Sequence, residues 1–104
     1  MMLLPQFTGF EWDEANRQKN WRRHKVAWWE CEEVLFNQPL YVHVDQWHSG
    51  KEERYYLLGR THNQRMLFVV FTRRGSKIRI ISARDMIRRE RKVYGQKAQK
   101  DTQV

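Results

Sequence analysis

The chain has 104 residues, 40% of them apolar and 13% aromatic, which is enough for one domain with a single hydrophobic core. Its one cysteine, Cys31, excludes an internal disulfide and favours a reducing, cytoplasmic setting, where we expect a structural thiol among apolar neighbours. The net charge is +8. The sequence has no apolar run of membrane-spanning length, and its start, MMLLPQF, is too short to be expected to act as a signal sequence.

The first part of the chain predicts an arm, a short strand and two helices. A loose arm over residues 1–9 leads into GFEW, which has the character of a short strand. Asp13 is a suitable N-cap for a helix that runs to about His24. WWECEEVLFN predicts a second helix, because its apolar residues recur at spacings of three and four, and Pro39 follows its end.

Four strands are expected next. LYVHV and RYYLLGR alternate between apolar and polar residues, and RMLFVVFT is an almost continuous apolar run that predicts the buried central strand. KIRIISA returns as its neighbour, with Ile78 and Ile80 on one face and Arg79 on the other. Short polar connections, including Asn63–Gln64, indicate an antiparallel meander.

The last predicted element is a helix. Ser82-x-x-Asp85 resembles a capping box at the start of MIRRERKVY, and Gly95 is expected to end this helix. The expected fold is therefore α+β, with N-terminal helices, an antiparallel four-stranded meander and a C-terminal helix. We assign the domain to residues 10–95 and a polar tail to residues 96–104.

Positive charge is concentrated in one segment. Residues 73–92 contain nine Lys/Arg against two acidic residues, whereas residues 1–60 contain eight against nine. Such a block is either a solvated face or a surface for a polyanion or an acidic protein. Because most of these residues are arginines, whose planar fork suits phosphate, and several lie on a predicted strand, we favour the second interpretation.

Recognisable catalytic motifs of other enzyme classes are absent. There is no glycine-rich phosphate loop, GxSxG, HExxH or paired CxxC, and the four histidines do not have metal-ligand spacing, so no metal or cofactor is expected. Arginines with isolated histidines suit RNA cleavage by the RNA's own 2′-hydroxyl. That reaction needs a proton acceptor, cations for the pentavalent phosphate and an acid for the leaving oxygen.

Eight short motifs then resemble one protein family, over roughly residues 10–95. They are FEWD at 10–13, Asn20, RHKV at 23–26, EERY at 52–55, LGR at 58–60, VVFTRRG at 69–75, RIISAR at 79–84 and ERKVY at 90–94. The chain resembles the BrnT toxins of bacterial type II toxin–antitoxin systems. The resemblance implies a RelE-like fold, a ribonuclease that inhibits translation, and neutralisation by a BrnA-type antitoxin whose complex with the toxin binds operator DNA.

Two positions depart from the family pattern. Family members usually have glycine where this chain has Lys25, so either the helix ends differently or the turn survives with a non-glycine residue. A lysine is also common where this chain has Asn16. Neither departure touches the arginines.

The candidate catalytic residues are Arg60, Arg84, Arg79 and His24, and the candidate RNA-binding residues are Arg73, Arg74, Lys77 and Arg88. Each arginine has the alternative of a solvated or partly covered side chain. His24 either transfers a proton or caps its helix.

Neighbouring residues have predicted roles as well. Tyr94 is expected to be packed and Glu90 to pair with a neighbouring arginine, while Trp47 and His48 are candidates for stacking on a base. Two function classes remain open: a metal-independent endoribonuclease, and a non-catalytic basic module that binds nucleic acid or an acidic protein.

Overall fold

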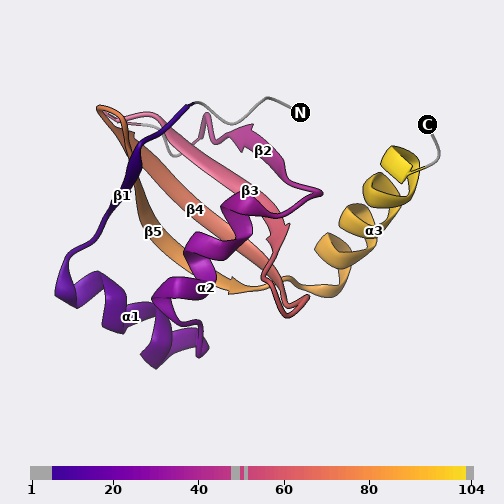
Figure 1. The fold of residues 1–104 in the computed structure, drawn as a ribbon, viewed down its shortest axis with the longest axis horizontal. Coiled ribbons are helices and arrows are strands. Elements are labelled where there is room, and N and C mark those ends of the chain that lie inside the picture. Colours follow the sequence, from indigo (N-terminus) through magenta and orange to yellow (C-terminus); the bar gives the residue numbers. More distant parts are fainter. Residues whose placement is uncertain (1–5, 48–49, 51, 103–104) are drawn as a thin grey trace.

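The computed structural model of the chain describes residues 6–47, 50 and 52–102, and it shows an α+β fold built on one sheet (Figure 1). The elements are β1 (Gly9–Glu11), α1 (Glu14–His24), α2 (Trp28–Glu33), the short 3-10 helix η1 (Val34–Phe36), β2 (Tyr41–Val44), β3 (Arg54–Arg60), β4 (Met66–Arg74), β5 (Lys77–Asp85) and α3 (Arg88–Thr102). Within these described ranges, no helix is both long and apolar enough to cross a bilayer.

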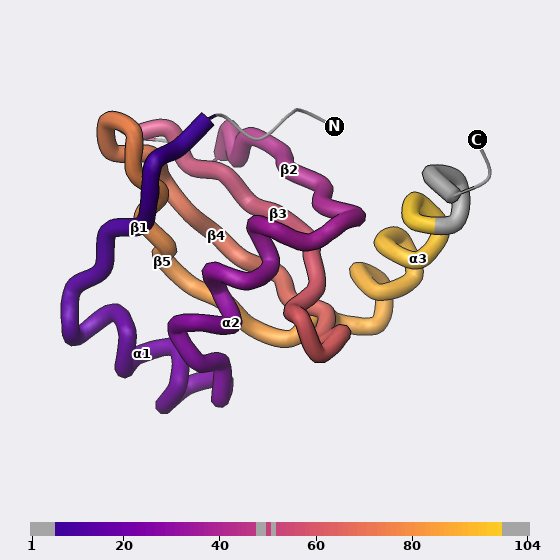
Figure 2. The backbone as a smooth tube through the Cα atoms, in the orientation of Figure 1, coloured from indigo at the N-terminus to yellow at the C-terminus, as the bar shows by residue number. Residues whose placement is uncertain are grey.

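The sheet has five strands in the order β1-β5-β4-β3-β2, so β4 is central as its apolar run predicts. The antiparallel meander β2–β5 is confirmed, but a purely antiparallel four-stranded sheet is wrong. β1 pairs in parallel with the start of β5, with Phe10 opposite Ile78, which makes the sheet mixed (Figure 2). The GFEW segment is too short for its sequence to reveal which strand it joins.

One face of the sheet forms the main core. Leu57, Leu67, Val69 and Phe71 are fully buried there beside Ile78 and Ile80, as strand alternation predicts. Helix α2 contributes Cys31, which is fully buried, and η1 contributes Val34. Burial raises the pKa of the Cys31 thiol to about 12, so this cysteine is a structural residue.

Helix α1 begins and ends close to the predicted positions. The Asp13 carboxylate accepts a bond of 2.7 Å from the Asn16 N–H, and this N-cap starts the helix. At the other end Lys25 has a left-handed backbone with φ 55°, and its N–H bonds to the carbonyls of Asn20 and Trp21. Lys25 therefore ends the helix in the left-handed conformation that glycine usually adopts at such a position.

Polar side chains of α1 hold an irregularity in β5. The pairing of β4 with β5 shifts register between Val70 and Phe71, which leaves Ile81 as an extra residue. Asn16 Nδ2 donates to the Ile80 carbonyl, and Lys19 Nζ donates to the Ile81 carbonyl at 2.7 Å. Buried Asn20 accepts the Ala83 N–H at 3.2 Å. Asn16 thus has a structural role in holding this irregularity.

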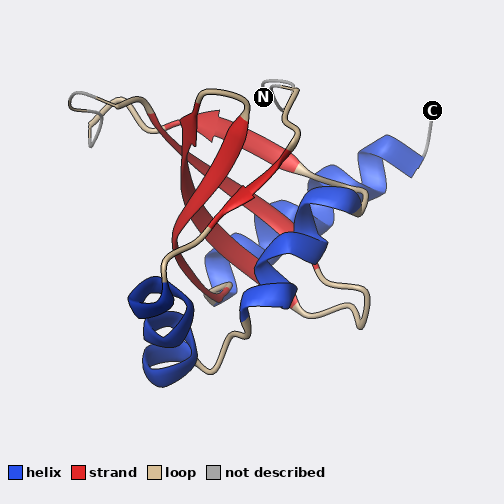
Figure 3. Cartoon of the chain, turned by 60° about the vertical axis from the view of Figure 1, so that its left-hand side comes forward, coloured by secondary structure: helices blue, strands red, loops and turns tan. Residues whose placement is uncertain are grey.

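Helix α3 lies on the opposite side of the sheet from α2 (Figure 3). Its Tyr94 packs with Met86 and Tyr41, and the Tyr94 hydroxyl donates to the Pro39 carbonyl at 2.7 Å, which confirms a packed role for this residue. This small cluster covers only one end of the side of the sheet that faces away from the main core.

The predicted boundaries of the last helix are wrong. Ser82 and Asp85 lie in β5, so they form no capping box. The helix starts at Arg88, where the Glu90 carboxylate accepts the Ile87 N–H at 2.9 Å. It also continues through Gly95 to Thr102, because an interior glycine costs only about 1 kcal/mol and good helix formers follow it.

Candidate functional site

The side of the sheet that α1 and α2 do not cover is the candidate functional surface. Side chains that alternate away from the main core there are only partly buried, as for Tyr56, Phe68, Val70 and Arg84. We call this surface, formed by the outward residues of β2–β5, the open face. Helix α3 covers it at one end only, through Tyr94 and its neighbours.

Arg84 occupies the open face next to α3. Its guanidinium lies 4.2 Å from the ring centre of Phe68, and its two terminal nitrogens donate to the two oxygens of Glu90 at 2.8 and 3.0 Å. Burial alone would raise the pKa of Glu90, but the bonds from Arg84 and from the Ile87 N–H outweigh burial and lower it. Glu90 is therefore ionised and pairs with an arginine, as predicted.

Arg60 lies at the same end of the open face, on β3. Within the described ranges, no carboxylate lies within ion-pair distance of its side chain. Burial raises the pKa of the nearby Tyr94 phenol, and the positive charge of Arg60 offsets part of that increase. Arg60 opposes Met66 and Arg84 opposes Phe68, so their Cα atoms are about 12 Å apart across β4. Two side chains of arginine length can meet over that distance.

A second group of cations lies at the far end of the open face, around a groove of about 470 Å³. It is lined by Gly50, Glu52, Arg54, Thr72, Arg74, Arg79 and Ile81. Carboxylates neutralise two of these arginines: Arg79 pairs with Asp13 at 3.2 Å, and Arg74 pairs with Glu52 at 3.2 Å and with Glu11 at 3.7 Å.

Arg79 is thus separate from the other two candidate catalytic arginines. It opposes Thr72, whereas Arg84 opposes Phe68, so the two arginines lie about 13 Å apart along the sheet. In the free protein different carboxylates hold them, Asp13 for Arg79 and Glu90 for Arg84, so the two guanidinium groups do not converge on one point.

The remaining candidate RNA-binding residues do not form one cluster. Arg73 points to the other side of the sheet, where it lines a pocket with Phe7 and Phe10 and donates to the Gly75 carbonyl at 2.9 Å. Lys77 is exposed at the start of β5, and Arg88 is exposed at the start of α3.

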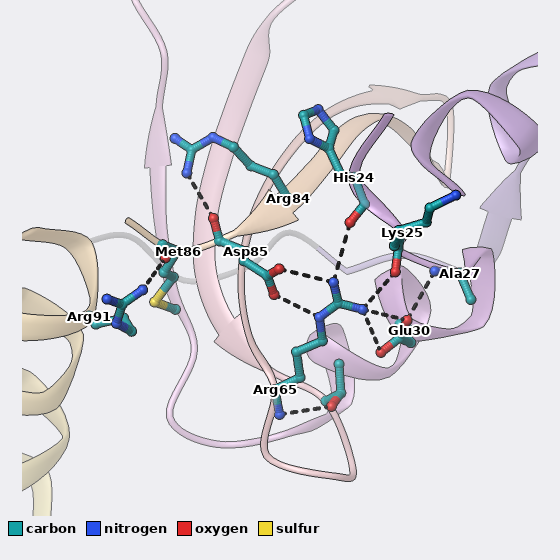
Figure 4. Close-up of polar contacts among 10 residues, drawn as sticks. His24, Lys25, Ala27, Glu30, Arg65, Arg84, Asp85, Met86 and Arg91 are labelled. Carbon is teal, nitrogen blue, oxygen red and sulfur yellow. Dashed lines mark hydrogen bonds and ion pairs between the residues drawn. The ribbon is translucent and has the colours of Figure 1, made fainter. Parts of the chain in front are cut away.

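His24 is exposed at the end of α1, and no described hydrogen bond, ion pair or ring contact joins its side chain to the three candidate catalytic arginines. Its backbone carbonyl accepts a long bond of 3.4 Å from Arg65 (Figure 4). Its role in proton transfer stays a prediction.

Sequence reasoning missed Arg65, which connects three distant segments (Figure 4). Its guanidinium donates to Asp85 at 2.7 and 3.1 Å, to Glu30 at 3.0 Å and to the Lys25 carbonyl at 2.9 Å. The bond from Arg65 is the main reason that the pKa of Asp85 is lowered. Arg65 is therefore a structural residue that ties the end of α1 to the end of β5.

A row of rings across the open face was also missed. His43 stacks on Tyr56 with 5.3 Å between ring centres, Tyr56 stacks on Phe68 at 5.7 Å, and Arg84 follows. Alternation along LYVHV and RYYLLGR could have predicted that His43 and Tyr56 lie on the same face of the sheet. Burial, with the charge of Lys97 nearby, lowers the pKa of His43, so its imidazole is neutral at physiological pH.

Of the two residues predicted to stack on a base, Trp47 is 91% exposed, and His48 lies outside the described residues. No group of three or more potential metal ligands is found in the part of the chain that the structure describes.

Comparisons with known proteins identify a family and a similar solved structure. The profile of the family described as "Ribonuclease toxin, BrnT, of type II toxin-antitoxin system" matches residues 12–90. The crystal structure of the Brucella abortus ribonuclease toxin BrnT is similar, with 23% sequence identity and a TM-score of 0.56, over 77% of this chain and 97% of that chain. A comparison with curated proteins finds no match.

Proposed function

This chain belongs to the BrnT family of ribonuclease toxins of type II toxin–antitoxin systems, and on that premise we propose that it is a metal-independent endoribonuclease that inhibits translation by cutting RNA on its open face. The observation that carries the proposal is the pair Arg60 and Arg84. These two arginines project from strands on either side of β4, at the end of the open face that α3 borders.

Arginine suits the charge that develops in this reaction. When the RNA 2′-oxygen attacks phosphorus, negative charge builds on the pentavalent phosphate before the bond to the 5′-oxygen breaks. Arginine does not lose its proton in proteins, so a pair of arginines can stabilise this charge but cannot accept the 2′ proton. Arg79, farther along the sheet, would contact a neighbouring part of the RNA.

Glu90 is the proton acceptor that the geometry favours. It is ionised, and both of its oxygens are held by the fork of Arg84 in the free protein. A phosphate that takes over this fork releases the carboxylate a few ångströms from the RNA. Without its arginine partner Glu90 becomes more basic, because the interaction that lowers its pKa is removed.

His24 remains the proposed donor of the proton that the leaving 5′-oxygen needs. Its exposed side chain would have to approach the reacting phosphate in the RNA complex, since free-state contacts of catalytic groups are often loose.

The experiment that tests this proposal compares Glu90→Gln with the unaltered chain on a short RNA in EDTA. Glutamine still accepts the Ile87 N–H and keeps the helix start, but it cannot accept a proton. We expect cleavage per folded molecule to fall by about 100- to 10,000-fold, with a small loss of thermal stability because the ion pair with Arg84 becomes a neutral hydrogen bond. Glu14→Gln, an exposed carboxylate on α1, is the matched control and should cleave normally.

Three results would oppose parts of the proposal. Full activity of Glu90→Gln removes Glu90 as the base, and loss of wild-type cleavage in EDTA shows a metal requirement. RNA binding without any cleavage by the folded wild-type chain would favour the non-catalytic basic module.

Membership of a type II system implies an antitoxin protein as partner. We propose a BrnA-type antitoxin whose complex with this chain binds operator DNA, in the cytoplasm where its RNA substrates are. No cofactor takes part in the proposed reaction.

A further inference from the structure

An apolar groove lies on the outer surface of α1 and α2. It has a volume of about 330 Å³ and is lined by Glu14, Arg17, Gln18, Trp21, Ala27, Trp28 and Trp29, which together we call the tryptophan groove. Trp21 is 51% exposed and Trp29 is 54% exposed. Large indoles that stay half exposed beside a cavity are typical of a surface that a partner covers.

The walls of this groove are already ordered by local contacts. Trp28 and Trp29 pack edge to face with 5.6 Å between ring centres, and the guanidinium of Arg17 lies 4.6 Å from the centre of the Trp28 ring. Lys25 lies 5.4 Å from the centre of the Trp21 ring. The groove therefore presents indole surface with cations beside it.

Helix α1 separates the tryptophan groove from the sheet. The side chains of Asn16, Lys19 and Asn20 bond to β5, while Glu14, Arg17 and Trp21 lie on the opposite side of the helix. The groove is thus about one helix diameter, roughly 10 Å, from the β5 edge of the sheet. It is not part of the open face.

We propose that the tryptophan groove is the anchor site for a segment of the antitoxin that carries a large apolar side chain flanked by carboxylates. This inference rests on the proposed function, because it takes the toxin to have a protein inhibitor. The groove is apolar enough to hold such a side chain. Two cations border it: Arg22 donates to Gln18 of the groove, and Lys25 lies over Trp21, so acidic residues that flank the apolar side chain would meet positive charge.

RNA is a poorer occupant of this groove. Its lining is mainly indole and offers little to hold a phosphate inside it, and the guanidinium of Arg17 is held over Trp28. The cations that remain available for phosphate at the proposed reaction site lie on the open face instead.

An anchor at this site also explains how an inhibitor could stay in place on the open face. About four extended residues span one helix diameter, so a segment that leaves the groove can cross α1 to the β5 edge, and a few further residues would continue onto the open face. Two linked contacts then bind more tightly than either alone, because the second contact forms at a high effective concentration.

The test uses the full chain and, as probe, the purified protein that suppresses its toxicity on co-expression. Trp21→Ser and Trp29→Ser should each raise the Kd of this complex at least tenfold, while RNA cleavage by the free variants stays within twofold of wild type. Trp47→Ser is the matched control, because Trp47 is 91% exposed and does not line the groove. The Kd of the antitoxin complex should be the same for Trp47→Ser as for wild type. Circular dichroism confirms that each variant is folded.

A second pair of variants covers the case of a serine variant that fails to fold. Gln18 lies in the groove and is exposed. Gln18→Glu should weaken the complex, and Gln18→Lys should not, because the proposed segment is acidic.

The proposal is overturned if folded Trp21→Ser and Trp29→Ser bind the antitoxin within twofold of wild type. It is also overturned if they lose RNA cleavage but keep antitoxin affinity, since the groove would then serve RNA. Absence of toxicity and of RNA cleavage in the wild-type chain is a different result, which contradicts the proposed function itself.

Discussion

Replacing Arg65 with methionine should destabilise the fold strongly, because the guanidinium of Arg65 bonds to three separate segments of the chain. Methionine keeps much of the apolar stem and removes the guanidinium. The change leaves Glu30, Asp85 and the Lys25 carbonyl without their partner. These contacts link the end of α1 to the last residue of β5 and to α2 at once.

The magnitude follows from the burial of the groups involved. Breaking a buried ion pair by removing one partner costs about 3–5 kcal/mol. The Arg65 side chain is 27% exposed and that of Asp85 is 60% exposed, so water compensates part of the loss. We expect a loss of about 2–3 kcal/mol in the free energy of unfolding, a decrease of roughly 10–20 °C in Tm for a domain of this size.

The assay is urea denaturation at pH 7, with Arg23→Met as a control that removes an exposed arginine from α1. Arg65→Lys should lie between wild type and Arg65→Met, because an ammonium group cannot reproduce the fork. A loss below about 0.5 kcal/mol in Arg65→Met, the scale of an ordinary surface substitution, would refute this account of the contacts.

The same prediction has a pH dependence with a defined sign. The pKa of Asp85 is depressed in the folded state, mainly by the bond from Arg65. Its contribution to stability is therefore present above the unfolded pKa of about 3.9 and is lost as the pH falls through the lower folded value. The difference in stability between wild type and Arg65→Met should narrow when the pH is lowered from about 5 to about 2.

Four further results are expected. Lys25→Gly should stabilise the fold by about 0.5–1 kcal/mol in urea denaturation, because the backbone at φ 55° favours glycine, whereas Lys25→Ala should not stabilise it. Arg60→Ala should lower kcat for RNA cleavage about 100-fold with stability within about 0.5 kcal/mol, and Arg60→Lys should rescue only part of the activity. Full activity in folded Arg60→Ala would remove it from the site. His24→Asn should impair cleavage by about 100-fold or more if His24 transfers a proton, and a stable, fully active variant would exclude that role. The rate of antitoxin association should fall as salt rises, since exposed charges are screened beyond about 8 Å at physiological ionic strength. A rate indifferent to salt would argue against an antitoxin segment on the basic residues.

Regular periodicity made most of the fold predictable. Alternation in RYYLLGR and the apolar run of RMLFVVFT correctly predicted β3 and the central β4, because a one-residue shift in either strand would expose its core residues. The Asp13 cap fixed the start of α1. These features depend on neighbours within a few residues, which a sequence displays directly.

Features that depend on distant partners were not predictable. The parallel addition of β1 depends on a register with β5 across nearly 70 residues, and the three strand residues of β1 carry too little pattern to indicate it. Ser82 and Asp85 have the spacing of a capping box, yet strand pairing with β4 keeps both extended. In that segment, pairing with β4 outweighs the local preference of Ser82-x-x-Asp85 for a helix start.

The candidate site was predicted as a set of residues but not as an arrangement. Alternation correctly placed Arg79 away from the buried isoleucines. It could not show that Asp13, distant in sequence, would pair with Arg79. In the same way, the packed state of Tyr94 was expected, but its bond to Pro39 depends on a segment 55 residues earlier.

In the folded chain, carboxylates partly neutralise the positive charge that the sequence concentrates in residues 73–92. Arg74, Arg79 and Arg84 each bind a carboxylate, and two of those pairs draw on acidic residues from the first 60 positions. Pairing reduces repulsion among the cations, so the chain can fold with them close together.

An RNA phosphate that reaches the open face then exchanges with a carboxylate on Arg84 and meets Arg60 without such competition. Because the carboxylate released from Arg84 is Glu90, the exchange that binds the phosphate also frees the group proposed to accept the proton. Substrate binding and activation of the base would thus be one event, which is why Glu90→Gln and Arg84→Ala should lose activity together without a further loss in the double variant.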